Sequence, residues 1–185
     1  LCPNHDKLFD KGFISFDDNG KILISDLLDT TNRIFLNIDE KMNIILADDD
    51  EDDRDIFRQA IEELGLNVNL LTFETGDDLL DYLFDPETIE LPHILFLDLN
   101  MFCVKYENCL NEIRKREKLR DMSIAIYSTS TAEKDIHETF IGGANIYISK
   151  PNDFQVLKKS LREVLKINWQ FHTSGLSKDT FLFSI

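Results

Sequence analysis

The chain has 185 residues, which is long enough for one hydrophobic core and a small appendage. Its 35 acidic and 20 basic residues give a net charge of −15, and a chain this negative is repelled by nucleic acid. No apolar run approaches the roughly 18–20 residues that span a bilayer, so we expect neither nucleic acid nor a membrane as a partner.

Residues 1–41 differ in pattern from the rest of the chain. The apolar runs Phe13–Phe16 and Lys21–Ser25 are joined by a polar segment that ends in Asn19-Gly20, which predicts a β-hairpin. Two strands alone are marginally stable in water, so this hairpin is expected to need support from another part of the protein. We therefore divide the chain into an N-terminal hairpin segment (1–41), a main domain (42–167) and a C-terminal tail (168–185).

From Met42 onward, short apolar runs alternate with segments of helical periodicity. The runs predict strands at Asn43–Ala47, Val68–Phe73, Ile94–Leu97, Ile124–Tyr127 and Ile146–Ile148. Apolar residues at helical spacing follow each of them: Ile56, Phe57, Ala60, Ile61 and Leu64 before Gly65; Leu79, Leu80, Leu83 and Phe84 before Asp85-Pro86; Cys109, Leu110 and Ile113; a segment ending at Gly142-Gly143; and Phe154, Leu157, Leu161, Val164 and Leu165.

Two local features of these helices can also be predicted. Arg114–Arg120 is expected to be the solvent-exposed end of the third helix, and Ser130 with Glu133 has the spacing of a capping box for the fourth. Five continuous apolar strands, each followed by a helix, predict a parallel sheet that helices cover on both faces.

Polar side chains stand at the carboxyl ends of these strands, where ligands bind in such sheets. Asp48-Asp49-Asp50 follows the first strand, Asp98 the third, Ser128 the fourth and Lys150 the fifth. Crowded carboxylates repel one another unless a cation lies among them, and Mg²⁺ suits an all-oxygen site. An ionised carboxylate can then attack phosphorus, while Mg²⁺, an ammonium and a hydroxyl hold the phosphoryl oxygens.

Four segments together resemble the receiver domain of response regulators in two-component signalling, over about residues 42–167. They are Ile44–Asp50, Leu95–Met101, Tyr127–Ser130 and Tyr147–Pro151, in this order and each at a strand end. The likeness is strongest to stand-alone receivers found beside phytochrome-type and other sensor kinases. It implies an α/β fold, a doubly wound five-stranded parallel sheet of the (βα)5 flavodoxin-like kind, with the N-terminal hairpin as an appendage.

The resemblance implies a phosphoacceptor and a metal site. Asp98 would accept a phosphoryl group from a sensor histidine kinase or a phosphotransfer protein. Mg²⁺ would be bound by Asp49, by Asp98 and by the backbone carbonyl of Asn100, and by Asp48 through a water molecule.

The resemblance also implies phosphoryl-binding and switch residues. Ser128 and Lys150 would bind the phosphoryl group, and Lys150-Pro151 matches a turn that is often a cis peptide in that family. Tyr147 stands where the family has a switch aromatic, which rotates inward when the hydroxyl residue shifts.

The loop after the proposed acceptor departs from the family pattern at two positions. Phe102 stands where a proline is usual, and Tyr106 where a glycine is expected. Both departures bear on the choice of kinase and the rate of phosphorylation, and neither removes a chemical group that the reaction needs.

Three functions are considered. The first is a phosphorylation-driven switch without a DNA-binding output domain, which signals by contact with a downstream protein or a second copy of itself. The resemblance to receiver domains implies that the partner face lies around Ala132–Phe140 and Phe154–Leu165. The second is an adaptor of the same fold that needs no phosphate, which the departures at Phe102 and Tyr106 favour.

The third function is an enzyme. An aspartate-based phosphatase would need an acid two residues after Asp98, where this chain has Asn100. The segment Cys2–Gly12 resembles the closing part of an HNH endonuclease module, in which His5 would be a metal-site residue, but one histidine does not make a nuclease site. We therefore expect a signalling protein rather than an enzyme.

The cysteines and the tail give two further expectations. Cys2, Cys103 and Cys109 are odd in number and lack CxxC spacing, which favours free thiols in a reduced, cytoplasmic protein. The tail from Trp169 to Phe183 is rich in aromatic residues and should either fold back on the domain or form an interface, with the interface favoured.

Overall fold

The computed structural model describes residues 14–16, 22–25, 41–88, 91–101, 103–105, 108–120, 122–166 and 181–183. Strands β1 (Ile14–Phe16) and β2 (Ile22–Ile24) pair antiparallel in a small sheet of their own, so the two predicted hairpin strands are confirmed. The turn between them lies outside the described residues.

The main sheet has six parallel strands in the spatial order β4-β3-β5-β6-β7-β8. They are β3 (Met42–Ala47), β4 (Val68–Phe73), β5 (Ile94–Leu97), β6 (Ile124–Ser128), β7 (Ile146–Ser149) and β8 (Leu182–Phe183). The five predicted strands and the doubly wound fold are confirmed, and the tail adds β8 as a sixth strand beside β7. The winding reverses between β3 and β5, which is where such sheets open a ligand site at their carboxyl edge.

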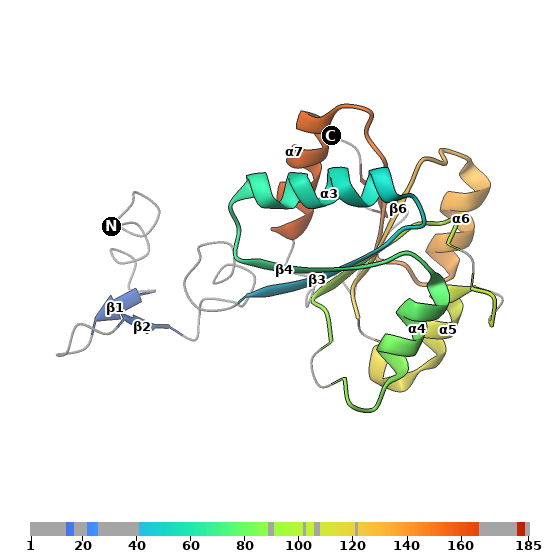
Figure 1. The fold of residues 1–185 in the computed structure, drawn as a ribbon, viewed down its shortest axis with the longest axis horizontal. Coiled ribbons are helices and arrows are strands. Elements are labelled where there is room, and N and C mark those ends of the chain that lie inside the picture. Colours follow the sequence, from blue (N-terminus) through green and yellow to red (C-terminus); the bar gives the residue numbers. More distant parts are fainter. Residues whose placement is uncertain are drawn as a thin grey trace.

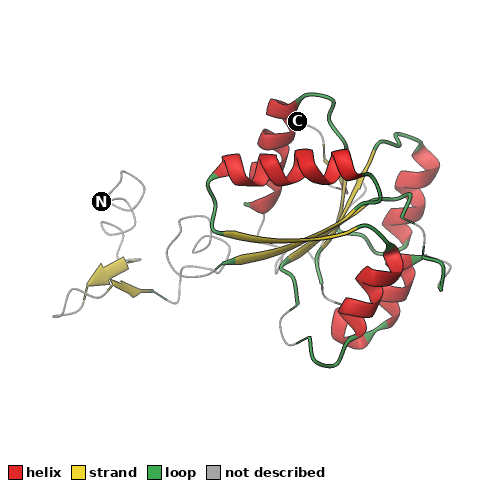
Figure 2. Ribbon diagram, viewed as in Figure 1, coloured by secondary structure: helices red, strands yellow, loops and turns green. Residues whose placement is uncertain are grey.

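Helices cover both faces of this sheet (Figures 1 and 2). They are α3 (Glu51–Leu64), α4 (Gly76–Phe84), α5 (Cys109–Lys115), α6 (Glu133–Ile141) and α7 (Phe154–Leu165), with a 3-10 turn at Glu117–Leu119. Helices α3 and α7 lie on one face and pack against each other, whereas α4, α5 and α6 lie on the other. None of the helices in the described part of the chain combines the length and apolar character needed to cross a bilayer.

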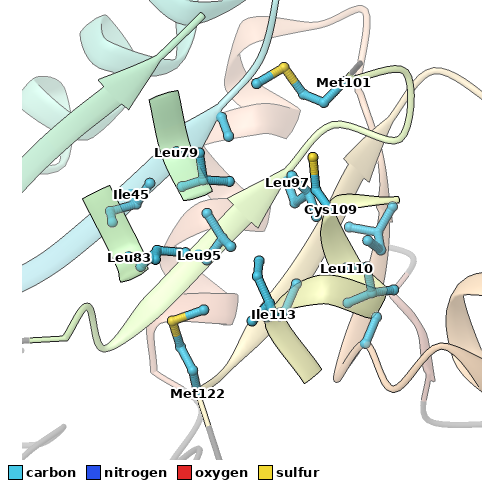
Figure 3. Close-up of a cluster of buried hydrophobic side chains, with 14 of the residues drawn as sticks. Ile45, Leu79, Leu83, Leu95, Leu97, Met101, Cys109, Leu110, Ile113 and Met122 are labelled. Carbon is cyan, nitrogen blue, oxygen red and sulfur yellow. The ribbon is translucent and has the colours of Figure 1, made fainter. Parts of the chain in front are cut away.

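Alternating strand residues build a core on each face of the sheet. Leu46 and Phe96 point toward α3 and α7, whereas their neighbours Ile45 and Leu95 point toward α4 and α5. Figure 3 shows the second cluster, in which side chains of α4 and α5 lie over those of the central strands. Burial on both faces explains why these strands read as continuous apolar runs.

Helix α3 follows the prediction except at one residue. Phe57, Ala60, Ile61 and Leu64 are buried, but Ile56 is 45% exposed. At 100° per residue, Ile56 lies about 40° beyond Ala60, at the edge of the buried stripe, so the prediction that it belongs to the core is wrong. Gly65 ends the helix as predicted, with a left-handed φ of 64° that glycine adopts without strain.

The predicted capping box at α6 is wrong. The helix begins after Ala132, and no side chain in the described part of the chain caps it. Ser130 lies two residues earlier, where its hydroxyl donates to the Asp135 carboxylate over 2.6 Å and accepts from the Ala132 N–H over 3.3 Å. Ser130 therefore orders the loop between β6 and α6.

The prediction of a solvent-exposed helix end is confirmed for residues 115–118 and Arg120, which are exposed. Arg114 lies in the last turn of α5 but is half-buried rather than solvent-exposed as predicted, and it links three parts of the chain. Its guanidinium donates to the carbonyl oxygens of Gly143 and Met122, each over 2.8 Å, and to the Asn145 side-chain oxygen over 3.0 Å. The same Asn145 oxygen accepts from the Ile124 N–H over 2.8 Å. Arg114 thus joins α5 to the segments that lead into β6 and β7.

Replacing Arg114 by alanine is expected to lower the free energy of unfolding by about 2–4 kcal/mol, because partly buried carbonyl groups lose a charged donor. Urea denaturation would measure this loss. The matched control is Arg162→Ala on the exposed side of α7, which should change the free energy of unfolding by less than about 0.5 kcal/mol. Equal losses in the two variants would contradict this role of Arg114.

Candidate functional site

Backbone hydrogen bonds fix the residues that follow the strands. The Asp48 N–H donates to Phe73 O over 3.0 Å, and the Asp98 N–H donates to Ala47 O over 2.8 Å. On the other side, the Lys150 N–H donates to Ser128 O over 2.8 Å. The ladder of the sheet thus continues past the strand ends, and it holds the first residue of each following loop at one edge.

Three carboxylates meet at this edge. One oxygen each of Asp48, Asp49 and Asp98 lies within 4.8 Å of the other two. Asp48 and Asp98 are buried, whereas Asp49 is exposed. The Asp48 Oδ2 and Asp98 Oδ1 atoms are both shielded from solvent. Asp48 Oδ2 lies 2.7 Å from the Lys150 Nζ, whereas Asp98 Oδ1 has no hydrogen-bond partner among the described residues. Such oxygens in a cluster of acids are the donor set that a hard divalent cation prefers.

Asp50 has a different task, although it belongs to the same acidic run. Its carboxylate caps α3 by accepting from the backbone N–H groups of Asp52 and Asp53, over 2.8 and 3.2 Å. Asp48 in turn accepts from the Asp50 N–H over 3.1 Å, and its carbonyl accepts from Arg54 over 2.8 Å. This corner fixes the direction in which α3 leaves the site.

Lys150 brings a positive charge into the acidic cluster. Its side chain is only 8% exposed, and its Nζ lies 2.7 Å from Asp48 Oδ2, 2.7 Å from Asp53 Oδ2 and 3.8 Å from Asp98 Oδ1. The ammonium also lies 5.4 Å from the centre of the Tyr127 ring. Burial alone would lower the pKa of Lys150, but the hydrogen-bonding carboxylates of Asp48 and Asp53 outweigh it and raise the pKa, so Lys150 is charged.

Asp53 was not predicted as a site residue. It lies in the first turn of α3 and accepts a hydrogen bond from Lys150, which is 97 residues away in sequence. The sequence offers one indication of this position. Asp53 follows the capping residue Asp50 by three residues, so the two side chains lie on the same side of the helix.

The two buried acids resist ionisation. Burial raises the pKa of Asp98 to about 6, helped by the negative charges of Asp48 and Asp49 and opposed by Lys150 and the Leu99 N–H. Burial also raises the pKa of Asp48, although its contact with Lys150 opposes the shift. The positive charge of one ammonium therefore does not neutralise both carboxylates, and further positive charge would stabilise their ionised forms.

The predicted switch residues lie beside this cluster. Ser128 is fully buried, and its Oγ accepts from the Ser130 N–H over 3.2 Å. Tyr147 is also fully buried and faces inward, where its hydroxyl donates to Ser130 O over 2.9 Å. Asn100 lies in the turn that the Met101 N–H closes onto Asp98 O over 3.4 Å.

The loop after Asp98 gives one correction. Cys103 and Cys109 are joined as a disulfide, with Cα atoms 6.0 Å apart, so the prediction of free thiols is wrong for this pair. A separation of six residues fits no cysteine motif, so the sequence did not indicate this pairing. The cysteines therefore no longer argue for a reducing compartment. The departures at Phe102 and Tyr106 lie outside the described residues, as does His5.

A second correction concerns Lys150-Pro151. The resemblance allowed for a cis peptide at this turn, but every peptide bond in the described part of the chain is trans. Lys150 thus reaches the acidic cluster from a trans peptide.

The raised pKa of Asp98 predicts how stability changes with pH when no divalent ion is present. A carboxyl group that titrates at about 6 in the folded protein and near 3.8 in the unfolded chain stabilises the fold at low pH. This contribution, about 1–3 kcal/mol, should be lost as the pH rises from about 4 to about 6. Asp98→Asn should therefore be more stable than the wild type at pH 7, with the advantage shrinking toward pH 4.

Thermal unfolding in a chelating buffer at several pH values would measure this difference. Asp52→Asn is a suitable control because Asp52 is exposed on the first turn of α3. If the Asp98→Asn and wild-type curves stay parallel from pH 4 to pH 7, Asp98 does not carry the buried charge described here.

Comparison with known proteins agrees with this architecture. Residues 44–162 match the family model of the response regulator receiver domain. Among curated relatives, the probable methanogenesis regulatory protein FilR2 of Methanothrix harundinacea is 28% identical over 131 residues, which cover 70% of this chain and 84% of that protein. A chemotaxis protein CheY homolog of Campylobacter jejuni is 29% identical over 124 residues, covering 67% and 92%.

A solved structure is similar over the same part of the chain. The response regulator RPA3017 in red light signalling of R. palustris superposes with a TM-score of 0.60 at 25% identity, covering 74% of this chain and 96% of that one. Three observations agree on one family. They are the strand order, the acidic cluster at the switch point of the sheet and the family match over most of the chain. The chain belongs to the response regulator receiver domain family.

Proposed function

We propose that the protein is a phosphorylation-driven signalling switch, in which Asp98 accepts a phosphoryl group from a sensor histidine kinase or a phosphotransfer protein. One observation carries the proposal: the Lys150 ammonium lies 3.8 Å from Asp98 inside a cluster of three carboxylates from two strands. Structural ion pairs seldom bury two carboxylates for one lysine, because each uncompensated charge costs stability. Binding of a divalent cation and then of a phosphoryl group would explain why two carboxylates are buried around one lysine.

Receiver domains bind Mg²⁺ or Mn²⁺ at an acidic pocket, and the residues of this chain fit such an ion. The buried Asp98 Oδ1, which has no hydrogen-bond partner among the described residues, supports the fit, together with the exposed Asp49 beside it. In the proposed site, Asp49, Asp98 and the Asn100 carbonyl bind Mg²⁺ directly, and Asp48 binds it through water. When bound, the ion supplies the positive charge that lets Asp98 ionise near neutral pH and that neutralises phosphoryl oxygens.

The residues of the chain then have defined tasks in phosphoryl transfer. A carboxylate oxygen of Asp98 attacks the phosphorus of a phosphohistidine, a new O–P bond forms, the N–P bond breaks, and the imidazole leaves. The Lys150 ammonium neutralises one phosphoryl oxygen, and the Ser128 hydroxyl donates to another. Asp53 holds the lysine before transfer, since its contact with Lys150 is shorter than that of Asp98.

Signalling is proposed to occur through contact with a downstream protein or a second copy of the chain. The proposed partner face comprises Ala132–Phe140 and Phe154–Leu165, which lie on either side of the sheet edge that β8 occupies. Nucleic acid or a membrane is not a proposed partner. Residues 42–167 act as the receiver in this proposal, residues 1–41 and 168–185 flank it, and the protein works in the cytoplasm.

An adaptor that never takes up phosphate is the second candidate, and the departures at Phe102 and Tyr106 favour it. The family consists of signalling domains rather than classical enzymes, so neither a phosphatase nor a nuclease is proposed. Beryllofluoride, a phosphoryl mimic, separates the switch from the adaptor because only a working phosphoryl site binds it. Amide chemical shifts that do not change on its addition would favour the adaptor.

Phosphorylation of Asp98 is tested directly by mass. Incubation of the full chain with acetyl phosphate and Mg²⁺ should add the mass of one phosphoryl group, and a chelator should prevent the addition. Asp98→Asn should give no adduct, whereas Asp52→Asn should react like the wild type. An adduct that persists in Asp98→Asn would place the acceptor elsewhere.

The role of Lys150 is tested by removing its charge. Lys150→Met should slow phosphoryl transfer by about 100-fold, the usual cost of losing one group that stabilises a transition state. Lys158→Met is the matched control, because Lys158 of α7 forms an ion pair with Glu63 of α3, away from the acidic cluster. Rates of acetyl-phosphate labelling would decide, and equal rates in the two variants would exclude Lys150 from the transfer step.

A further inference from the structure

The C-terminal segment Phe181–Phe183 lies against the edge of the receiver sheet. Strand β8 pairs in parallel with β7, so that Leu182 stands opposite Tyr147 and Phe183 opposite Ile148. The prediction that the tail forms an interface is therefore wrong for these residues, which fold back on the domain, while 167–180 lie outside the described residues.

Phe181 anchors this segment in the core. Its side chain is only 1% exposed and belongs to the same buried cluster as Tyr147. The Phe181 ring lies edge-on to Phe140 of α6, with ring centres 5.1 Å apart, and 6.2 Å from the ring of Tyr147. The next residue, Leu182, is 45% exposed, whereas Phe183 is partly buried and packs against the core cluster that includes Ile148. Phe181 is therefore the residue of this segment that is buried beside Tyr147.

Tyr147 connects this anchor to the candidate phosphoryl site. Its ring is flanked by Phe181, whereas its hydroxyl donates to Ser130 O over 2.9 Å. Ser130 in turn donates its N–H to the Ser128 Oγ over 3.2 Å. A continuous set of contacts therefore runs from the tail through Tyr147 and Ser130 to the hydroxyl that faces the proposed phosphoryl group.

We propose that Phe181 and β8 form a clamp that holds Tyr147 inward and thereby couples docking of the C-terminal segment to occupancy of the phosphoryl site. This inference rests on the proposed function, because it needs a phosphoryl group at Asp98. Phe181 is a positioning residue in this account, since it acts through Tyr147.

The contacts also predict whether docking of the C-terminal segment strengthens or weakens binding at the phosphoryl site. While Tyr147 faces inward, it fixes the Ser130 peptide, and that peptide holds Ser128 with its oxygen as a hydrogen-bond acceptor. The Ser128 proton is then directed away from the Ser130 N–H. The Ser128 hydroxyl also makes a hydrogen bond with the inward Tyr147 hydroxyl, which holds it in place until it donates to a phosphoryl oxygen. The docked segment therefore prepares the site, and by linkage a phosphoryl group must strengthen docking by the same factor.

Titration of the full chain with beryllofluoride in Mg²⁺, followed by amide chemical shifts, tests the clamp. Phe181→Ala should bind beryllofluoride about 5-fold or more weakly than the wild type, within the usual range of coupling between sites. Leu182→Ala is the matched control, because it removes an exposed side chain from the same strand and leaves the backbone pairing intact. Its affinity should equal that of the wild type.

Two further measurements distinguish coupling from a loss of packing. Tyr147→Phe removes the hydroxyl link to Ser130, so adding Phe181→Ala to it should weaken binding much less than Phe181→Ala does alone. In the wild type, beryllofluoride should slow hydrogen exchange at the β8 amide that faces β7, and this readout needs no variant to fold.

The outcomes separate this inference from the proposed function. Wild-type protein whose amide shifts do not respond to beryllofluoride would overturn both. A wild type that responds, together with Phe181→Ala of equal affinity or unchanged exchange at β8, would overturn the clamp alone. Tighter binding by Phe181→Ala would show the opposite sign and would also overturn it.

Discussion

The burial of two carboxylates around one lysine is the constraint on which the rest of the site depends. Asp48 and Asp98 are almost fully shielded from water, and Lys150 lies between them and Asp53. Burying a charge that is not fully neutralised costs stability. Burial therefore favours the neutral form of Asp98 and raises its pKa to about 6. The same imbalance favours uptake of a cation, and it makes the site responsive to a change of charge. A well-neutralised cluster would be more stable and would have less reason to bind anything.

The position of this cluster follows from sheet topology. Parallel strands place their carboxyl ends at one edge, and the reversal of winding between β3 and β5 opens space there. Because the strands are buried on both faces, their apolar runs end abruptly where a polar residue begins. The sequence therefore predicts that Asp48, Asp98 and Lys150 lie at one edge of the sheet. It does not predict which of the acidic side chains Lys150 contacts most closely. The structure adds that Lys150 contacts Asp53 and Asp48 more closely than Asp98.

What sequence reasoning missed depends on contacts between distant segments. Asp53 looked like one more acid at a helix start, and its partner lies 97 residues away. Arg114 looked like part of a charged helix end, yet it bonds to carbonyl groups before two strands. Strand β8 has two residues, too few for any periodicity to predict, and it exists because Phe181 fills a place beside Tyr147. The spacing of apolar residues predicts local structure, such as a helix or a strand. The contacts of Asp53, Arg114 and β8 depend instead on how distant segments pack together in the folded domain, so this spacing does not indicate them.

A structure of the full chain with Mg²⁺ and beryllofluoride tests the central claim most directly. The account predicts beryllium bonded to an Asp98 oxygen, a metal ion in contact with Asp49, and the Lys150 ammonium moved from Asp53 to a fluorine atom. Ions bound away from this edge of the sheet, or a Lys150 ammonium that remains with Asp53 beside an occupied Asp98, would contradict it.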